Sequence, residues 1–112
     1  ADSKEIAIKT VEALLRCVPS SVPGIAFLSG GQTDAFATQN LNAMNALDSY
    51  PHPWELSFSY GRALQAACLK AWNGDSENLT NAQKVFSHRC KCNGAARNGS
   101  YSEKIEQEIS VS

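Results

Sequence analysis

Two short stretches of the chain contain residue types that could bind an anion. The first ends in Ser29-Gly30-Gly31 and the second in Gly61-Arg62. Ser29 offers a hydroxyl group, and a glycine lets backbone N–H groups approach an anion with no Cβ in the way. The Arg62 guanidinium can donate two parallel hydrogen bonds to one phosphate. Together these residue types predict a site that holds a phosphate group.

Two other interpretations apply to the same residues. The glycines could serve only as strand-to-helix turns and Arg62 as a solvated charge, and spacing alone favours neither this nor a phosphate site. Residues 28–32, Leu-Ser-Gly-Gly-Gln, also match the signature loop of the ABC-type ATPases. That hypothesis requires an upstream Gly-x-x-x-x-Gly-Lys-Ser/Thr loop and a downstream acidic strand, and neither occurs in these 112 residues. A five-residue match without this context is weak.

Each stretch is typical of a strand that leads directly into a helix. Residues 24–31 form an apolar run bounded by proline and glycine, which suits a strand buried on both faces. In the second stretch, Leu56, Phe58 and Tyr60 alternate with serines, the period of a strand with two unlike faces. Two strands that each feed a helix predict a parallel sheet. The glycines would then lie at the carboxyl ends of the strands, where parallel α/β folds bind ligands.

Helical patterns precede and follow the two strands. A first helix begins after Asp2, with Glu5 in the position of a capping box, and ends before the prolines that lead to the first strand. A second helix is capped by Thr33. Its buried stripe is predicted to be Ala37, Leu41, Met44 and Leu47. Residues 48–53 form a turn-rich connector to the second strand.

Two more helices follow the second strand. The third begins near Arg62 and ends at Gly74, and we expect Leu64, Cys68 and Trp72 to pack on the sheet. The fourth is capped by Asp75 or Ser76. Its predicted stripe is Leu79, Ala82, Phe86 and Cys90. Asn98-Gly99 ends this helix, and the polar tail from residue 100 is expected to fray.

Residue types for other chemistry are poorly placed. His88 and Cys92 share a helical face, but Cys90 points onto the apolar stripe, so four zinc ligands are not available. We therefore expect no metal, and a small buried thiol at Cys90. Neither strand interior contains a lysine or a carboxylate, so no Schiff-base amine, general acid or general base is evident.

The composition limits the class of protein. A chain of 112 residues is about one small domain, and a net charge of −1 gives no electrostatic reason to expect a nucleic acid or a membrane. No apolar run approaches the roughly 20 residues of a membrane span. The four cysteines form no Cys-x-x-Cys pair, and the first residues show no signal-peptide pattern, so we expect reduced thiols and a cytoplasmic location.

Longer stretches of the chain resemble the class I fructose-bisphosphate aldolases. The resemblance is carried by residues 22–32, 41–45, 53–54, 58–65 and 69–72. Residues 89–97 with Tyr101 resemble the ending of the bacterial-type members. The resemblance implies an α/β fold, a partial (β/α)8 TIM barrel. Residues 1–112 would be the C-terminal part of this single domain: helix 6, strand 7, helix 7, strand 8, helix 8 and a C-terminal helix.

The resemblance also implies an activity and the residues that serve it. The family cleaves fructose 1,6-bisphosphate reversibly to glyceraldehyde 3-phosphate and dihydroxyacetone phosphate in glycolysis, through a lysine imine and without a metal or cofactor. Positions that hold a substrate phosphate in the family match Ser29, Gly30, Gly61 and Arg62. Neighbouring ligand-lining positions match Leu28 and Ser59. No catalytic residue is expected here, because the imine lysine belongs to strand 6, and the 112 residues alone are expected to be inactive.

Length and one substitution depart from the family pattern. A full barrel needs about 250 residues, so the two strands are expected to have open edges and uncovered apolar faces. The expected partners are the sugar bisphosphate, the rest of the barrel and, when complete, further copies in a homo-oligomer. Phe36 stands where the family usually has a polar residue. The alternative function is that of a truncated, non-catalytic phosphate-binding or interaction module.

Overall fold

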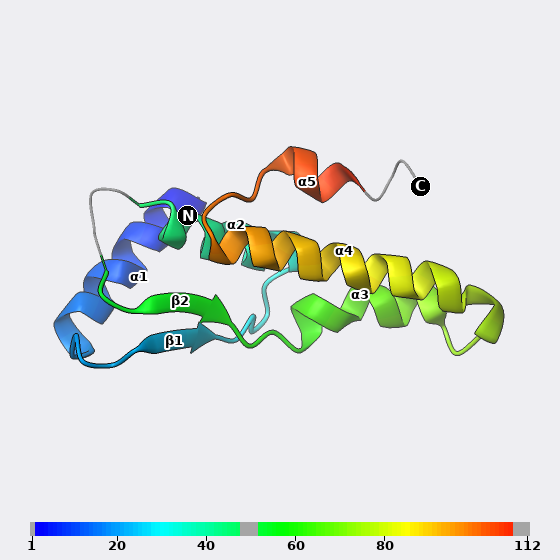
Figure 1. Ribbon diagram of the computed structural model, residues 1–112, viewed down its shortest axis with the longest axis horizontal. Helices are drawn as coiled ribbons and strands as arrows, with labels where there is room; N and C mark the ends of the chain where they lie inside the picture. The colour runs from blue at the N-terminus through cyan, green and yellow to red at the C-terminus, as the bar shows by residue number, and fades with distance from the viewer. Residues whose placement is uncertain (1, 48–51, 109–112) are drawn as a thin grey trace.

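The computed structural model describes residues 2–47 and 52–108, so residues 48–51 of the predicted connector lie outside the described part. The elements follow in the order α1 (Ser3–Cys17), β1 (Gly24–Phe27), α2 (Asp34–Asn45), β2 (Glu55–Phe58), α3 (Arg62–Trp72), a 3-10 turn (Ser76–Asn78), α4 (Leu79–Arg97) and α5 (Glu103–Gln107) (Figure 1). The caps of the first two helices are those predicted. Asp2 Oδ1 accepts from Glu5 N at 2.8 Å, and Thr33 Oγ1 accepts from Phe36 N at 3.2 Å.

The two strands form the predicted parallel sheet. Their register pairs Gly24 with Glu55 and Phe27 with Phe58, and the two arrows in Figure 1 point the same way. Successive residues of β1 alternate between exposed and half-buried, so the expectation that this strand is buried on both faces is wrong. One face of the sheet packs on the apolar core, whereas Gly24, Ala26 and Glu55 of the other face are exposed.

The uncovered face of the sheet is not apolar, although the sequence predicted uncovered apolar faces. Ile25 and Phe27 of β1 pack with the apolar core on the covered face, beside Leu56 of β2. The opposite face carries small or polar residues: Gly24, Ala26, Glu55 and Ser57. The alternation therefore keeps the apolar side chains under the helices. The strand edges are open as expected, but the open face is not apolar.

The core lies between α1, α2, β2 and α4. Ala37, Leu41 and Met44 of the predicted α2 stripe are buried. Trp54 is only 2% exposed, and its Nε1 donates to the Pro19 carbonyl at 2.8 Å. This bond ties together the two segments that enter the strands. Among the helices of residues 2–47 and 52–108, none has the length and hydrophobicity to cross a bilayer.

The predicted packing of α3 is only partly correct. Leu64 packs near the strands, whereas Cys68 and Trp72 lie against α4 beside Leu79 and Phe86. The two helices form a hairpin that extends past the sheet in Figure 1. The end of this hairpin extends past the strands, and its large apolar side chains Leu69, Trp72, Leu79 and Phe86 are exposed.

The buried face of α4 is also not the predicted stripe. Cys90 is exposed, while Cys92, His88 and Arg89 are buried. Of the predicted stripe only Ala82 is buried; α4 packs on α2 through Arg89 and Asn93, and it joins the apolar core through Cys92 and Ala96. The tail was expected to fray; residues 103–107 instead form α5, which agrees with the C-terminal helix that the resemblance implies, and Tyr101 is buried.

Candidate phosphate-binding site

The carboxyl ends of the two strands lie side by side. Ser59 N donates to the Phe27 carbonyl at 2.7 Å, which continues the pairing one residue beyond β2. The loop before α2 and the loop before α3 therefore leave the same edge of the sheet (Figure 1). Helix N-termini expose free N–H groups and the positive end of the helix dipole. Two such ends, those of α2 and α3, follow the two strand ends.

The loop after β1 is closed by Gln32 of the loop itself, which a side chain of α2 holds in place. Ser29 is 4% exposed, and its carbonyl accepts from Gln32 N at 3.2 Å and from Gln32 Nε2 at 3.0 Å. Asn40 Nδ2 donates to Gln32 Oε1 at 2.6 Å, which fixes the glutamine. The Ser29-Gly30-Gly31 turn is thus held at both ends before any ligand binds. Sequence reasoning missed Gln32 and Asn40, because neither carries an apolar or catalytic signal.

The glycines of the site face open space. A Cβ placed on Gly30, Gly31 or Gly61 would meet no other atom within 4 Å. Gly30 has φ +59°, so the backbone itself favours glycine there. Gly31 and Gly61 have no positive φ, and no contact in the described residues requires them to lack a side chain. The turn-only interpretation therefore accounts for Gly30 and leaves Gly31 and Gly61 unexplained.

The second loop rests on a buried tyrosine. Tyr60 is 7% exposed, its OH donates to the Ala37 carbonyl at 3.0 Å, and its ring centroid lies 5.4 Å from that of Phe58. Burial raises the pKa of Tyr60 to about 12. Because Ala37 belongs to α2, this bond joins the second loop to the helix that follows the first. The predicted alternation placed Tyr60 in the sheet but gave no sign of this contact.

The remaining predicted residues lie on the accessible side. Arg62 is the first residue of α3 and is exposed, and Gly61 precedes it without a side-chain cap. Leu28 is 74% exposed and Ser59 is exposed. All six predicted residues therefore belong to one edge, where Ser29 is buried and Arg62 is exposed.

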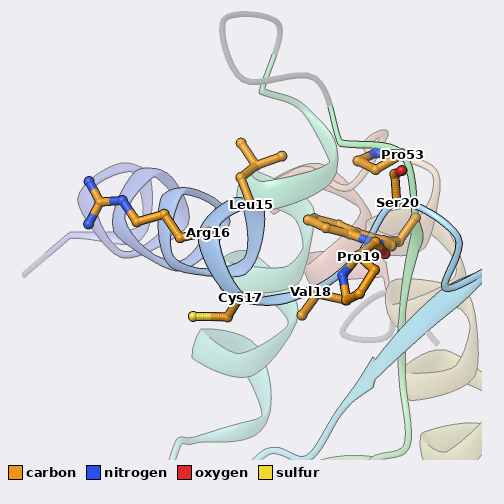
Figure 2. Close-up of a pocket in the computed structure, with 8 residues that line it drawn as sticks. Leu15, Arg16, Cys17, Val18, Pro19, Ser20 and Pro53 are labelled. Atoms are coloured by element: carbon orange, nitrogen blue, oxygen red, sulfur yellow. The ribbon is translucent and has the colours of Figure 1, made fainter.

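A hollow of about 390 Å³ lies at the opposite edge of the sheet (Figure 2). Leu15, Cys17 and Pro19 line it from the segment before β1, and Pro53 and Trp54 line it from the segment before β2. These residues precede the amino ends of the strands. Parallel α/β folds bind their ligands at the carboxyl ends, so this hollow is not the candidate site.

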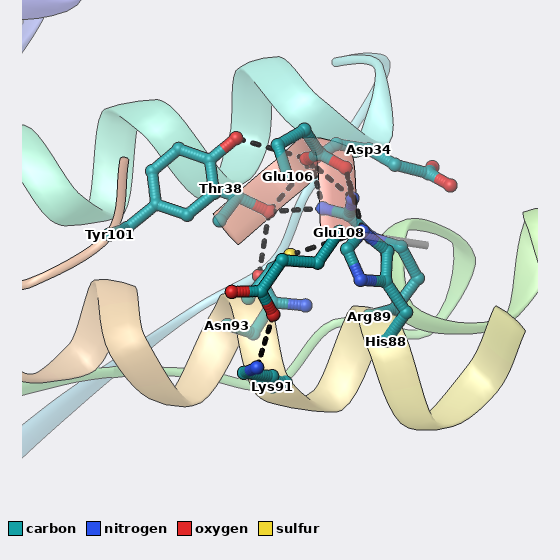
Figure 3. A network of polar contacts seen from close by, with 10 residues as sticks. Asp34, Thr38, His88, Arg89, Lys91, Asn93, Tyr101, Glu106 and Glu108 are labelled. Carbon is teal, nitrogen blue, oxygen red and sulfur yellow. Dashed lines mark hydrogen bonds and ion pairs between the residues drawn. The ribbon is translucent and has the colours of Figure 1, made fainter. Parts of the chain in front are cut away.

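A second polar cluster joins α2, α4 and α5 (Figure 3). Arg89 is 4% exposed; its Nη1 donates to both carboxylate oxygens of Glu106 at 2.6 and 2.7 Å, and its Nη2 donates to the Asp34 carbonyl at 3.1 Å. Thr38 Oγ1 accepts from Arg89 Nη2 at 2.5 Å and donates to Asn93 Oδ1 at 2.8 Å. Arg89 therefore links the first turn of α2 to the C-terminal segment.

Charge and burial oppose one another in this cluster. Burial alone would raise the pKa of Glu106, but its hydrogen bonds to Arg89, Tyr101 and His88 and the Arg89 charge hold it below its usual value. Burial, with the nearby Glu106 charge, raises the pKa of the Cys92 thiol to about 11. The carboxylate is thus stabilised as an anion and the thiol as a neutral group.

Comparison with known proteins identifies the chain's relatives. The family model described as "Fructose-bisphosphate aldolase class-I" matches residues 1–112. Fructose-bisphosphate aldolase 1 of Toxoplasma gondii is 54% identical over 101 residues, which are 90% of this chain and 27% of the relative. A cytoplasmic isozyme of Pisum sativum is 59% identical over 92 residues, 82% of this chain and 26% of the relative.

A solved structure gives the same result. The aldolase of Plasmodium falciparum, in a ternary co-crystal with TRAP and a small-molecule inhibitor, superposes with a TM-score of 0.86 at 46% identity. The match covers 91% of this chain and 29% of that one. The chain thus spans about a quarter of the length of the curated relatives it matches. None of these matches tests the bacterial-type ending.

Proposed function

The chain belongs to the class I fructose-bisphosphate aldolase family, and from this we propose that it supplies the sugar-phosphate binding loops of such an enzyme. The complete enzyme would cleave fructose 1,6-bisphosphate reversibly to glyceraldehyde 3-phosphate and dihydroxyacetone phosphate in glycolysis. The observation that carries the proposal is the pair of strand ends at one edge, with open space at Gly31 and Gly61.

Each residue of the edge has a part in holding the phosphate. The free N–H groups of the Gly30-Gly31 turn and the N-terminal end of α2 would donate to its oxygens. Arg62 would add charge-assisted hydrogen bonds from α3, each worth about 1.5–3 kcal/mol. Ser29 would donate its hydroxyl, and Leu28 and Ser59 would line the path of the sugar. Tyr60 and Gln32 keep the two loops in register.

The loops would contribute to catalysis by positioning the substrate. In an imine mechanism the electrons of the broken C–C bond move into the iminium group, so the substrate carbonyl must meet the lysine amine. A phosphate fixed at the strand ends places that carbonyl and removes orientational freedom from the reaction. The lysine would come from outside the 112 residues, so the chain alone would be inactive.

The fold supports a place in a (β/α)8 barrel. We assign α1 as helix 6, β1 and α2 as strand and helix 7, β2 and α3 as strand and helix 8, and α4 with α5 as the C-terminal segment. The small, polar open face of the sheet would face the barrel interior. Further partners would be the rest of the barrel and, in the complete enzyme, identical subunits. The names of the Pisum sativum and Arabidopsis thaliana relatives, cytoplasmic and cytosolic, favour a cytoplasmic location.

A chimaera tests the proposal. Residues 1–112 would replace the matching segment of the Toxoplasma gondii aldolase, and kcat and KM would be measured with fructose 1,6-bisphosphate. We expect an active chimaera in which Arg62→Ala raises KM about 10- to 100-fold, the loss of roughly one charge-assisted hydrogen bond. Arg16→Ala, at the opposite edge of the sheet, is the control and should leave both constants unchanged. Unchanged kcat and KM in Arg62→Ala would refute the assignment.

The alternative, a non-catalytic phosphate-binding module, rests on the absence of a lysine from both strands. Borohydride trapping of the chain with dihydroxyacetone phosphate, read by intact mass, should give no adduct under either hypothesis. The chimaera separates them. An inactive, folded chimaera, together with phosphate-induced amide shifts at Gly30, Gly31 and Arg62 in the chain alone, would favour the module.

A further inference from the structure

Three side chains of the types that bind transition metals converge between α4 and α5 (Figure 3). His88 and Cys92 lie four residues apart on one face of α4, and Glu106 reaches them from α5. Their ligand atoms all lie within 4.8 Å of one another. Cys92 is fully buried, His88 is 9% exposed, and the Glu106 side chain is 25% exposed. The group is therefore sheltered but open to water at one corner.

The distances suit a tetrahedral ion. Zinc bonds of about 2.3 Å to sulfur and about 2.0–2.1 Å to nitrogen and oxygen place N and O ligands about 3.4 Å apart, and S and N ligands about 3.6 Å apart. His88 Nε2 lies 3.2 Å from Glu106 Oε2 and 3.5 Å from Cys92 Sγ. Two of the three distances between ligand atoms therefore already match a tetrahedral zinc site. A small rotation of Glu106 would bring the third, between its carboxylate and the Cys92 sulfur, to the matching value.

From this geometry we propose that His88, Cys92 and Glu106 bind a zinc ion that fastens α5 to α4, with water at the open fourth position. A thiolate and an imidazole favour zinc over magnesium or calcium, which prefer oxygen ligands. On binding, Cys92 would lose its proton to solvent, and the thiolate and the carboxylate together would balance the two charges of the ion. The cleavage proposed above uses no metal, and this ion would have a structural role.

The surroundings of Glu106 are compatible with this role. Tyr101 OH donates to Oε1 at 2.9 Å, and Arg89 Nη1 donates to the same oxygen at 2.6 Å. Arg89 Nη1 also donates to Oε2 at 2.7 Å, and that bond would be given up to the ion, while the two contacts to Oε1 can persist. Such contacts orient a ligating carboxylate. The Arg89 charge would weaken the site, and the two anionic ligands offset it.

Cobalt(II) spectroscopy tests the proposal on the full chain, reduced, with any affinity tag removed. Cobalt(II) in a tetrahedral site with a thiolate gives intense visible d–d bands and a near-ultraviolet sulfur-to-cobalt band. We expect both bands at one equivalent of cobalt and their loss on addition of one equivalent of zinc. Cys92→Ser should abolish the charge-transfer band, and His88→Gln should weaken binding at least 10-fold. The control is Cys90→Ser, an exposed thiol two residues away that should keep the full spectrum.

The wild-type spectrum decides the question even if a variant fails to fold. Absence of a thiolate–cobalt band at one equivalent would overturn the proposal, and the three side chains would then form only the hydrogen-bonded cluster of Figure 3. A band that survives Cys92→Ser, or that disappears in Cys90→Ser, would also overturn it by assigning the metal to surface thiols. Far-ultraviolet circular dichroism of each variant verifies that the helices are retained.

Discussion

Two arginines of α4 each pair with a glutamate of another element, and the two pairs differ in burial. The Arg89 and Glu106 side chains are 5% and 25% exposed, whereas those of Arg97 and Glu55 are 37% and 73% exposed. Both arginines lie on α4 and both pair with a glutamate, but Arg89 is buried and donates to more acceptors than Arg97 does. We predict that Arg89→Met destabilises the fold strongly and that Arg97→Met does so barely.

The magnitude follows from the contacts that are lost. Arg89→Met removes donors to both Glu106 oxygens, to the Asp34 carbonyl and to Thr38 Oγ1. Removing one partner of a buried pair costs about 3–5 kcal/mol. Glu106 keeps the Tyr101 hydroxyl and some water, so we expect about 2–4 kcal/mol. An exposed pair is worth about 0–1 kcal/mol, which sets the expectation for Arg97→Met.

Urea unfolding followed by circular dichroism, with a chelator present, measures both variants. Two double-mutant cycles complete the design, one with Glu106→Gln and one with Glu55→Gln. The Arg89–Glu106 coupling energy should exceed about 1.5 kcal/mol, and the Arg97–Glu55 coupling should stay below about 0.5 kcal/mol. Equal coupling energies, or a larger loss in Arg97→Met than in Arg89→Met, would refute the reasoning that burial decides the worth of these pairs.

Three further predictions concern single positions. Leu41→Ala empties a fully buried site and should cost about 2–5 kcal/mol in urea unfolding; Leu69→Ala, 57% exposed, should cost far less, and equal losses would count against the core assignment. The folded-state pKa of Tyr60 is raised to about 12. Its protonated hydroxyl should therefore contribute fully to the free energy of unfolding below about pH 10, and this contribution should disappear as the pH rises to about 12. Tyr60→Phe should flatten this part of the stability–pH curve. Gly99→Ala should destabilise more than Gly74→Ala, since both have φ above +70° but only the first places a Cβ 3.0 Å from a carbonyl oxygen; equal melting temperatures would contradict this.

The features that could be predicted from the sequence are those with a local signal. Leu41 and Met44 recur at helical spacing and are buried. Two short runs followed by helices predicted the parallel pair, because such a connection leaves both strands pointing the same way. Gly30 and Gly61 located the edge of the sheet. In each case the information lies within a few residues.

The features that could not be predicted depend on distant partners. The buried face of α4 combines Cys92 and Ala96 with polar residues, and one of these, Asn93, is paired with Thr38, 55 residues earlier. No periodicity reports such a pairing, so the exposed Cys90 was expected to be buried. The order of the tail depends in the same way on Glu106 meeting Arg89. At the candidate site, the hydrogen bond from Tyr60 to α2 could not be predicted either, because its acceptor lies far away in the sequence.

The hairpin of α3 and α4 also determines how the chain moves through solvent. The molecule measures 50 × 24 × 24 Å, and its radius of gyration is 15.3 Å, against about 13 Å for a compact domain of this length. Its accessible surface is 6876 Å², against about 6,000 Å² for a compact protein of this mass. A monomer of this shape diffuses more slowly than a sphere of equal mass. A gel-filtration column calibrated with globular standards would therefore overestimate its mass, and light scattering is the measurement that separates an elongated monomer from a dimer.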